Sequence, residues 1–373
     1  ASWFITRKIC QGRPYMFLAM FILSFFVIGT FMEATAVTIM YINLASEICG
    51  RLGYQKGDKF YTVMMCGIYW GNAVVSAGSP ISHVLPLLLI VAAAPALGVT
   101  ISFGQWLMVG IPFEILSYLA LILVIRFIWK PETAKFANYN IDAMKENNQP
   151  LSMEGKITTM LFLLVVVIWL FPQFGRSIWP AGVAYLNQIG ACVPPIIALA
   201  LVCIIHVNGK PIARFPELVK TVPMGLLIFT ATVTVYGAAI NLDSCGISSW
   251  IYNLLSPILS GLPTAAVMAL LVFGGMLLTQ FTSNTVSMYL FYAITIALLA
   301  ASGINLPAFV IVAALGAMMG LVTPAAAVPS PLFFGPEHIN MKDTAKYAVI
   351  FLFLEFIVLM ALIWPLANAV IKF

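Results

Sequence analysis

The sequence predicts an all-α polytopic membrane protein that contains an inverted-topology repeat with two re-entrant hairpins and two broken transmembrane helices. Of its 373 residues, 62% are hydrophobic and 8% are charged, and the mean hydropathy is +1.03. Soluble domains carry about a quarter charged residues, so this composition excludes a soluble domain. Two further observations define the architecture: apolar stretches that approach the roughly 20 residues of a spanning helix, and the placement of Lys and Arg between them.

The apolar stretches are 15–32, 60–77, 105–128, 157–171, 184–206, 219–241, 262–281, 286–301, 305–322 and 345–371. The six cysteines are scattered without a CxxC pair, so we interpret them as small apolar residues and not as a disulfide framework or a metal site. The chain begins with Ala, and residues 1–14 are basic and lack the apolar run of a signal peptide. A fragment or a processed chain is therefore expected.

Basic residues lie on both sides of the first apolar segment, 15–50. They are Arg7, Lys8 and Arg13 before it and Arg51, Lys56 and Lys59 after it. Because Lys and Arg concentrate in cytoplasmic loops, both ends of the segment are expected on the cytoplasmic side. The segment then forms a re-entrant hairpin, and its turn lies at the Met-Glu-Ala-Thr sequence of residues 32–35.

A second hairpin is predicted where basic residues are missing. Residues 242–261 and 302–305 contain no Lys or Arg, so the stretch between them should enter from the outside, with its turn at QFTSNTVS, residues 280–287. This path places 16 of the 18 Lys and Arg residues in the cytoplasm. The predicted parts are the first hairpin 1–59, the first broken helix 60–104, connecting scaffold helices 105–241 with a cytoplasmic loop 130–156, the second hairpin 242–304, the second broken helix 305–340 and a C-terminal helix 341–373.

Each hairpin is followed by a span that small residues and proline interrupt. These interruptions are SAGSPISHVLP at 76–86 and LVTPAAAVPSP at 321–331. The order of hairpin and broken helix is the same in both halves, but the expected entry sides are opposite. This pattern is typical of the inverted repeats of secondary transporters.

Polar residues stand together at the second turn, where Ser283, Asn284 and Thr285 are consecutive. Irregular backbone at membrane depth is tolerated where it lines a cavity or is buried in protein. Free carbonyls, hydroxyls and amides there suit Na⁺, and the N-terminus of a half-helix suits an anion. Hydrogen bonding to neighbouring helices is the alternative, but several adjacent polar residues at a hairpin turn favour a ligand site.

The stretches TQFTSNTVSMYLF and LVTPAAAVPSPLFFG, together with GRPY and VGIPFEIL, resemble the divalent anion/sodium symporter family of the ion transporter superfamily. The resemblance covers essentially the whole chain. It implies a Na⁺-coupled secondary active transporter of a small organic or inorganic anion of the carboxylate type, which works by alternating access. It implies no enzyme activity, no cofactor, no nucleic-acid partner, and a place in the plasma membrane of a bacterium with the basic loops in the cytoplasm.

The resemblance also implies a ligand set at the second turn. A second Na⁺ site would be formed by Thr279, Thr282, Asn284 and the backbone at Ala326. The substrate would contact Ser283, Asn284, Thr285, Ala327 and Pro329, with Thr35 from the first turn. Ala327 stands where the family has a hydroxyl that faces the substrate. The family's N-terminal scaffold helices, which also support a homodimer, are missing before the first hairpin, so the expectation of a homodimer is weakened.

The first half departs from the family pattern. Glu33 and Ala34 stand where the family has Ser-Asn. Where the family has Gly-Thr, an ungapped match places Ser82-His83, and a less specific match places Gly78-Ser79-Pro80. By resemblance, Glu33, Ala34 and Ser82 would form a degenerate first cation site. Two interpretations of Glu33 stay open: it caps the N-terminus of a half-helix, or it forms a titrating pair with His83 that couples ions to transport. An ionised Glu33 would repel a dianion, so plain dicarboxylate transport is in question.

Three other functions compete with an anion symporter. The first is an H⁺-coupled carrier or cation/proton antiporter of the same superfamily that uses Glu33 and His83. The second is a membrane enzyme, which the sequence disfavours because HExxH, GxSxG, paired-Asp and Gly-rich phosphate motifs are missing. The third is a channel or a structural remnant. Glu114 and Glu355, which lie within apolar stretches, are expected to form hydrogen bonds between helices.

Overall fold

The computed structural model describes residues 10–138, 152–175, 178–190, 192–221, 228, 235, 243–259, 261–300 and 302–371. This part of the chain is helical apart from one short two-stranded hairpin. Four helices are long and apolar enough to cross a membrane: Pro14–Phe31, Phe103–Trp129, Met153–Pro172 and Met341–Val370. The all-α polytopic membrane fold predicted from composition is thus confirmed.

The chain forms two compact units. The larger unit comprises residues 1–101, 106–146 and 236–373, and the smaller unit comprises residues 102–105 and 147–235. Each unit is built from segments that are distant in the sequence. The residues of both predicted hairpins and both predicted broken helices belong to the larger unit, apart from residues 102–104 at the end of the first broken helix.

The first half of the larger unit begins with a pair of helices, α2 (Pro14–Phe31) and α3 (Ala34–Arg51), with Met32 and Glu33 between them. Pro14 starts α2 because proline at the first helical position lacks only an N–H that has no helical partner. The next helix, α4 (Lys59–Gly78), packs against both α2 and α3. It is buried over most of its surface, as expected for a helix that is apolar all round.

The helix α4 ends at Gly78, and α5 (Val84–Leu97) begins after a short break. At this break α4 meets α6 (Phe103–Leu123), which π-helical residues Val124–Trp129 extend. A Cβ atom added to Gly110 of α6 would lie 1.8 Å from the carbonyl oxygen of Gly78. The two backbones touch here, and glycine permits this approach because it has no side chain.

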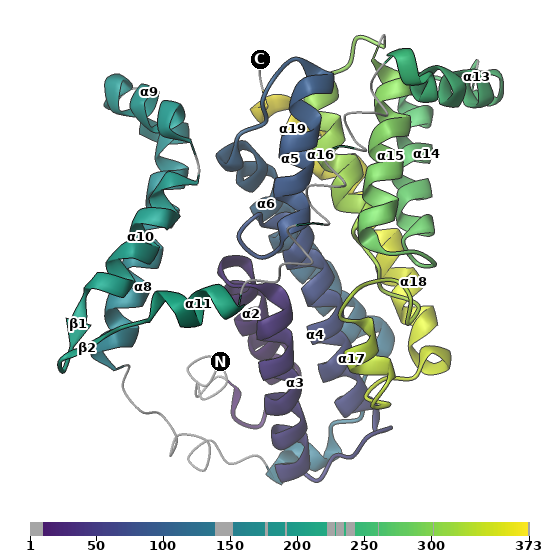
Figure 1. Cartoon of the computed structure of the whole chain (residues 1–373). Coiled ribbons are helices and arrows are strands. Elements are labelled where there is room, and N and C mark those ends of the chain that lie inside the picture. The colour runs from purple at the N-terminus through teal and green to yellow at the C-terminus, as the bar shows by residue number, and fades with distance from the viewer. Residues whose placement is uncertain are drawn as a thin grey trace. The chain divides into compact units, whose positions relative to one another are not determined.

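The second half repeats this arrangement. Helices α14 (Thr264–Leu278) and α15 (Asn284–Leu299) form a pair, and α16 (Leu306–Ala317) packs against both. Figure 1 shows α2 and α3 in the lower half of the larger unit and α14 and α15 in its upper half. The remaining helices are α13 (Ile247–Leu259), α17 (Ser330–Phe334), α18 (Met341–Ile357), the π-helical Val358–Ile363 and α19 (Trp364–Val370).

The smaller unit contains α8 (Met153–Phe174), α9 (Pro180–Ile189), α10 (Val193–Ile204) and α11 (Phe215–Thr221). The expectation of one continuous span over 184–206 is wrong, because the chain breaks between α9 and α10. Gly190 has a φ of 79° there, and the consecutive prolines Pro194 and Pro195 cannot continue a helix from the preceding turn.

A tight hairpin follows α10. Strands β1 (His206–Val207) and β2 (Lys210–Pro211) pair antiparallel. Both residues of the intervening turn, Asn208 and Gly209, have positive φ angles of 53° and 77°. Asn-Gly is the preferred sequence for such a turn. Most of the predicted span 219–241 lies outside the described residues, as does the central part, 139–151, of the predicted loop 130–156.

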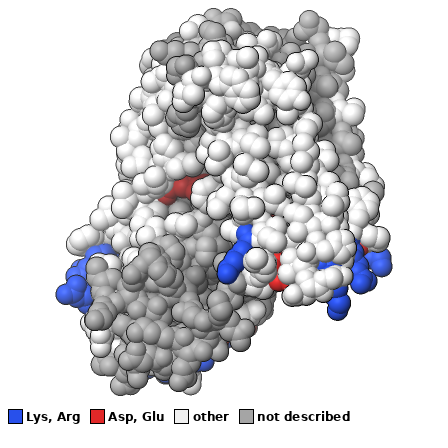
Figure 2. Space-filling view, turned by 90° about the vertical axis from the view of Figure 1, so that its left-hand side faces the viewer, with Lys and Arg blue, Asp and Glu red and all other residues white. Residues whose placement is uncertain are grey.

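The surface of the larger unit is apolar where a bilayer would contact it. On α6, the side chains of Ile115, Leu119 and Leu123 are exposed, and Phe127 continues the same row one turn later. Residues four apart share one face of a helix, so they form a lipid-facing stripe. On the face drawn in Figure 2, the described Lys and Arg side chains lie in the lower half, and an acidic patch lies above them at about mid-height.

An ion pair attaches the start of α4 to the segment that follows the π-helical residues Val124–Trp129. Lys135 Nζ donates to Asp58 Oδ2 at 2.8 Å, and the N–H of Gln55 donates to the same oxygen at 3.0 Å. The hydrogen bond from Lys135 and the bond from Gln55 hold the pKa of Asp58 below its usual value. The ionised form of Asp58 therefore stabilises the fold above the unfolded-state pKa of about 4.

We expect this stabilisation to be lost as the pH falls through the lowered pKa of folded Asp58. Since both side chains are more than a third exposed, it is worth under about 1 kcal/mol. Asp58→Asn should lower the thermal stability of the purified chain slightly at neutral pH and flatten its loss in acid. Lys135→Gln should reproduce both effects. Identical acid profiles for wild type and Asp58→Asn would show that the pair contributes nothing.

Candidate functional site

The end of the second hairpin brings together several of the predicted ligand residues. Helix α14 ends at Leu278 with Thr279 as its C-cap, and α15 starts at Asn284 with Ser283 as its N-cap. The hydroxyl of Thr279 donates to Asn284 Oδ1 at 2.7 Å. Thr282 has a different role, since its hydroxyl donates back to the Leu278 carbonyl at 3.2 Å.

The second broken helix meets this end at Gly320. A Cβ atom added to Gly320 would lie 2.5 Å from the carbonyl oxygen of Ala326 and 2.8 Å from Asn284 Oδ1. These two oxygens therefore approach the same small space, which stays open because residue 320 has no side chain. Three of the four residues predicted for the second Na⁺ site, Thr279, Asn284 and Ala326, are thus neighbours.

Gln280 connects the hairpin end to the break, and sequence reasoning did not assign it a role. Its Nε2 donates to the carbonyls of Met276 at 2.7 Å and Met319 at 2.6 Å. Its Oε1 accepts the N–H groups of Leu321 at 2.9 Å and Val322 at 3.0 Å. The amide of Gln280 thereby satisfies backbone groups that the broken helix leaves free. A buried amide next to an expected helix break was the signal that could have identified it.

The predicted substrate residues of the second half lie around the same end. Ser283, Asn284 and Thr285 are half-buried, whereas Ala327 and Pro329 are buried. The N–H of Ala327 donates to Ser330 Oγ at 3.0 Å. Ser330 also forms a 2.7 Å hydrogen bond with the hydroxyl of Tyr69 on α4, a long-range contact that sequence reasoning missed.

The first hairpin end is organised by Glu33. Its Oε1 accepts the N–H of Thr35 at 3.0 Å, and its Oε2 accepts the N–H of Ala36 at 2.7 Å. Glu33 is therefore the N-cap of α3, where a carboxylate is favoured by the helix dipole. Of the two interpretations of Glu33, a helix cap or a titrating pair with His83, the geometry is that of a helix cap. Thr35, the substrate residue predicted here, already donates its N–H to Glu33.

The other residues predicted for the first site lie at the same junction. The N–H of Ala34 donates to the carbonyl of Ser82 at 3.0 Å, which attaches the hairpin end to the break after α4. The hydroxyl of Ser82 is buried and has no hydrogen-bond partner among the described residues. His83 accepts the N–H of Leu85 through Nδ1 at 3.2 Å, so it caps α5.

Two buried acids, Glu114 and Glu355, lie outside the predicted ligand sets. Glu114 on α6 is hydrogen-bonded to the hydroxyl of Thr30 on α2. Glu355 on α18 accepts the hydroxyl of Ser117 on α6 at 2.6 Å. Both acids form the interhelical bonds expected for them, but the second carboxyl oxygen of each has no hydrogen-bond partner within the described residues.

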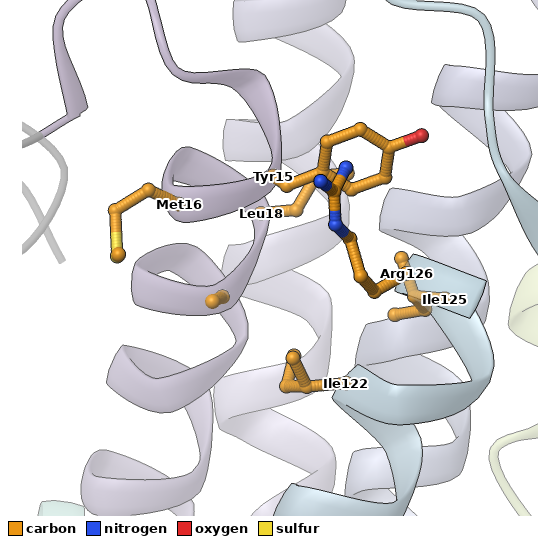
Figure 3. Close-up of a pocket in the computed structure, with 7 residues that line it drawn as sticks. Tyr15, Met16, Leu18, Ile122, Ile125 and Arg126 are labelled. Carbon is orange, nitrogen blue, oxygen red and sulfur yellow. The ribbon is translucent and has the colours of Figure 1, made fainter.

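Two cavities lie along the contact between α2 and α6. The larger, about 350 Å³, reaches Thr30 and Glu114. The smaller, about 190 Å³, lies nearer the beginning of α2, and Figure 3 shows Tyr15 and Arg126 at it. The guanidinium carbon of Arg126 is 4.1 Å from the centre of the Tyr15 ring, so a cation–π contact holds this basic group at the apolar surface.

Comparisons with known proteins give one family and several bacterial relatives. The family model described as the sodium:sulfate symporter transmembrane region matches residues 14–370. The chain is 25% identical over 353 residues to an uncharacterized transporter of Haemophilus influenzae, covering 92% of this chain and 71% of that protein. It is 22% identical over 358 residues to the sodium-dependent dicarboxylate transporter SdcS of Staphylococcus saprophyticus, covering 92% and 68%.

An L-tartrate/succinate antiporter of Escherichia coli is 28% identical over 291 residues. That match covers 74% of this chain and 55% of the antiporter. The three relatives are therefore longer than this chain, and their names describe transporters of anions or transporters without a stated substrate.

Proposed function

Because the chain belongs to the sodium:sulfate symporter family, we propose that it is a secondary active carrier of a small anion that couples anion movement to Na⁺. The observation that carries this proposal is the meeting of Thr279, Asn284 and Ala326 at Gly320. Neutral hydroxyl, amide and carbonyl oxygens suit Na⁺ without the cost of burying an unpaired charged ligand. The residues present therefore fit a Na⁺ site at the second hairpin end.

The anion would bind beside this site, at the beginning of α15. The N-terminus of a helix attracts an anion through its dipole and its free N–H groups. Ser283, Asn284 and Thr285 provide a hydroxyl, an amide and a second hydroxyl there. A Na⁺ ion that shares Asn284 with the anion would favour anion binding electrostatically, which is the physical basis for coupled transport.

Alternating access would use an inverted repeat, in which α2, α3 and α4 correspond to α14, α15 and α16. The packing of α4 against the first pair and of α16 against the second supports this correspondence. In the proposed topology, both pairs are re-entrant hairpins and the basic loops are cytoplasmic. Because the three relatives are bacterial proteins, we place the carrier in a bacterial plasma membrane.

The class of anion is tested by thermal stability. The purified chain should be stabilised by one or more of sulfate, succinate, tartrate and acetate in Na⁺, but not in choline at the same ionic strength. A bound ligand at about 100 times its Kd contributes about 2.7 kcal/mol, which is a clear shift in Tm. Dicarboxylates are expected to give the largest shift because a relative transports them. Equal shifts in Na⁺ and choline would contradict Na⁺ coupling.

A proton-coupled carrier that uses Glu33 and His83 is the second candidate. Ala34 directly follows Glu33, and Ser82 directly precedes His83. The hydrogen bond between Ala34 and Ser82 therefore brings Glu33 and His83 to one junction, which favours a joint role. This candidate predicts anion uptake that follows a pH gradient without Na⁺ and is lost in Glu33→Gln. Uptake by Glu33→Gln that keeps its response to the pH gradient would exclude it.

A further inference from the structure

We propose that Glu114 is a proton-binding site of this protein, located where the first hairpin, the first break and α6 meet, and separate from the ligand residues predicted at the two hairpin ends. The proposal has two parts. The first part, that Glu114 binds a proton, rests on the geometry of Glu114 alone. The second part, that the bound proton is linked to anion transport, rests also on the proposed function.

The carboxyl group of Glu114 is enclosed by three helices. Its side chain projects from α6, and the residue is 4% exposed. One oxygen, Oε2, is hydrogen-bonded to the hydroxyl of Thr30 in the last turn of α2. The other oxygen, Oε1, lies against the end of α4, because a Cβ atom added to Gly78 would be 2.5 Å from it. Movement of the hairpin end relative to α6 would therefore change the surroundings of this carboxyl group.

The hydrogen bonds around Thr30 indicate which protonation state fits. The hydroxyl oxygen of Thr30 is 2.7 Å from the Phe26 carbonyl oxygen and is also hydrogen-bonded to Glu114 Oε2. A threonine hydroxyl has one hydrogen to donate, and a carbonyl oxygen can only accept. If Thr30 donates to Phe26, Glu114 must donate to Thr30. Both contacts are hydrogen bonds at the same time only when Glu114 is a neutral carboxylic acid.

Loss of the proton from Glu114 would reverse the direction of the hydrogen bond between Glu114 and the Thr30 hydroxyl. The hydroxyl would then donate to the Glu114 carboxylate, and its contact with the Phe26 carbonyl would be left without a hydrogen. Glu114 Oε1 has no donor in the described part of the chain. Ionisation would therefore place a charge in a buried site with one hydrogen bond to stabilise it, which is unfavourable.

The groups that face Glu114 provide no compensating charge. From α2 and α4, the nearby turns 23–31 and 71–78 contain no titratable residue. On α6 itself, Tyr118 lines the same cavity, and its hydroxyl donates to the Ala19 carbonyl at 3.0 Å. Among the described residues, no Lys or Arg forms an ion pair with Glu114. The cavity of about 350 Å³ beside the carboxyl group is lined mostly by apolar side chains, which disfavours water molecules that could stabilise a charge there.

Thr30 also connects Glu114 to the break after α4. The carbonyl of Thr30 accepts the hydroxyl of Ser79 at 2.6 Å, and Ser79 Oγ in turn accepts the N–H of Ile81 at 3.2 Å. The protonation state of Glu114 thus affects Thr30, whose carbonyl holds the end of α2 against the break after α4. A negative charge on Glu114 would also repel an anion that enters the protein, so proton binding should favour anion binding.

Infrared spectroscopy of the purified full chain in lipid nanodiscs tests proton binding without transport. Neutral carboxyl groups have a C=O stretching band that carboxylates lack. We expect wild type to show such a band at neutral pH and Glu114→Gln to lose a component of it. Glu355→Gln is the matched control, because Glu355 is also buried and bonded to one hydroxyl. The Glu114 component of the band should remain in the spectrum of Glu355→Gln.

If Glu114→Gln does not fold, Thr30→Val provides the test of proton binding. In this variant the Glu114 component of the band should persist with a shifted frequency.

Anion uptake into proteoliposomes tests the second part of the proposal. With equal Na⁺ on both sides, an inward proton gradient should stimulate uptake by wild type and by Glu355→Gln, and this stimulation should be lost in Glu114→Gln. A carboxyl band that neither Glu114→Gln nor Thr30→Val changes would overturn proton binding. Na⁺-driven uptake without any response to the proton gradient would overturn the link to transport. A band that depends on Glu114 in a protein that transports no anion would keep the proton site and reject the proposed function.

Discussion

Replacement of Asn284 by Ala is expected to abolish the Na⁺-dependent rise in the thermal stability of the purified chain. Asn284 Oδ1 accepts the hydroxyl of Thr279 and faces the same space as the Ala326 carbonyl, so the substitution removes the side chain that joins the hairpin end to the break. The intrinsic loss of stability should be about 1 kcal/mol, the typical value for one hydrogen bond. The measurement is the Tm in Na⁺ and in choline at equal ionic strength.

Asn305→Ala is the matched control. Asn305 caps α16 by accepting the N–H of Ala308 at 3.3 Å, and it donates to the carbonyl of Ile371 at 2.6 Å. Its loss should destabilise the protein by about 1 kcal/mol and leave the Na⁺ response intact. If Na⁺ stabilises Asn284→Ala as strongly as wild type, the assignment of the second ion site to Asn284 is wrong.

Among the substitutions proposed for this protein, Gln280→Leu should cause the largest loss in the free energy of unfolding. Leu has a similar size but cannot accept the N–H groups of Leu321 and Val322 or donate to Met319. A buried donor without a partner costs about 1–3 kcal/mol, so two of them together should cost about 3 kcal/mol or more. The Na⁺ response should disappear as well, since the break would no longer be held against the hairpin end. Thermal unfolding with and without Na⁺ measures both effects.

Gln105→Leu makes the same chemical change at a helix start. Gln105 Oε1 accepts the N–H of Ser102 at 2.8 Å, a local bond at a half-buried position. The loss should be about 1 kcal/mol or less. Equal destabilisation by Gln105→Leu and Gln280→Leu would show that the four bonds of Gln280 have no special weight.

Local sequence signals predicted much of the fold. The apolar segments and the polar turns at 32–35 and 280–287 led to helices and helix pairs that the structure contains. The family resemblance, based on four short sequence stretches, is confirmed by the match over residues 14–370. The re-entrant topology, the inverted repeat and the roles of the ligand residues stay predictions, because they concern a membrane and ligands.

The features that sequence reasoning missed depend on long-range contacts or on local breaks inside an apolar run. Gly190 and the two prolines after it divide the segment 184–206, but hydrophobicity alone extends across them. Tyr69 and Ser330 are 261 residues apart, and Thr30 and Glu114 are 84 apart. No periodic pattern within either segment indicates such a partner, so these pairs could be identified only from the folded chain.

Because Glu33 caps α3, its carboxylate competes with a soluble anion for the N–H groups at the first hairpin end. A soluble anion that seeks the N–H groups of Thr35 and Ala36 meets a carboxylate that is already bound there and belongs to the same chain. A group tethered at such short range has an effective concentration in the millimolar range or above, so a more dilute anion is excluded from these donors. The cap of the second end, Ser283, is neutral. In the proposed carrier, substrate affinity would therefore depend mainly on the second end, and a substitution of Glu33 would be the most direct way to add anion affinity at the first.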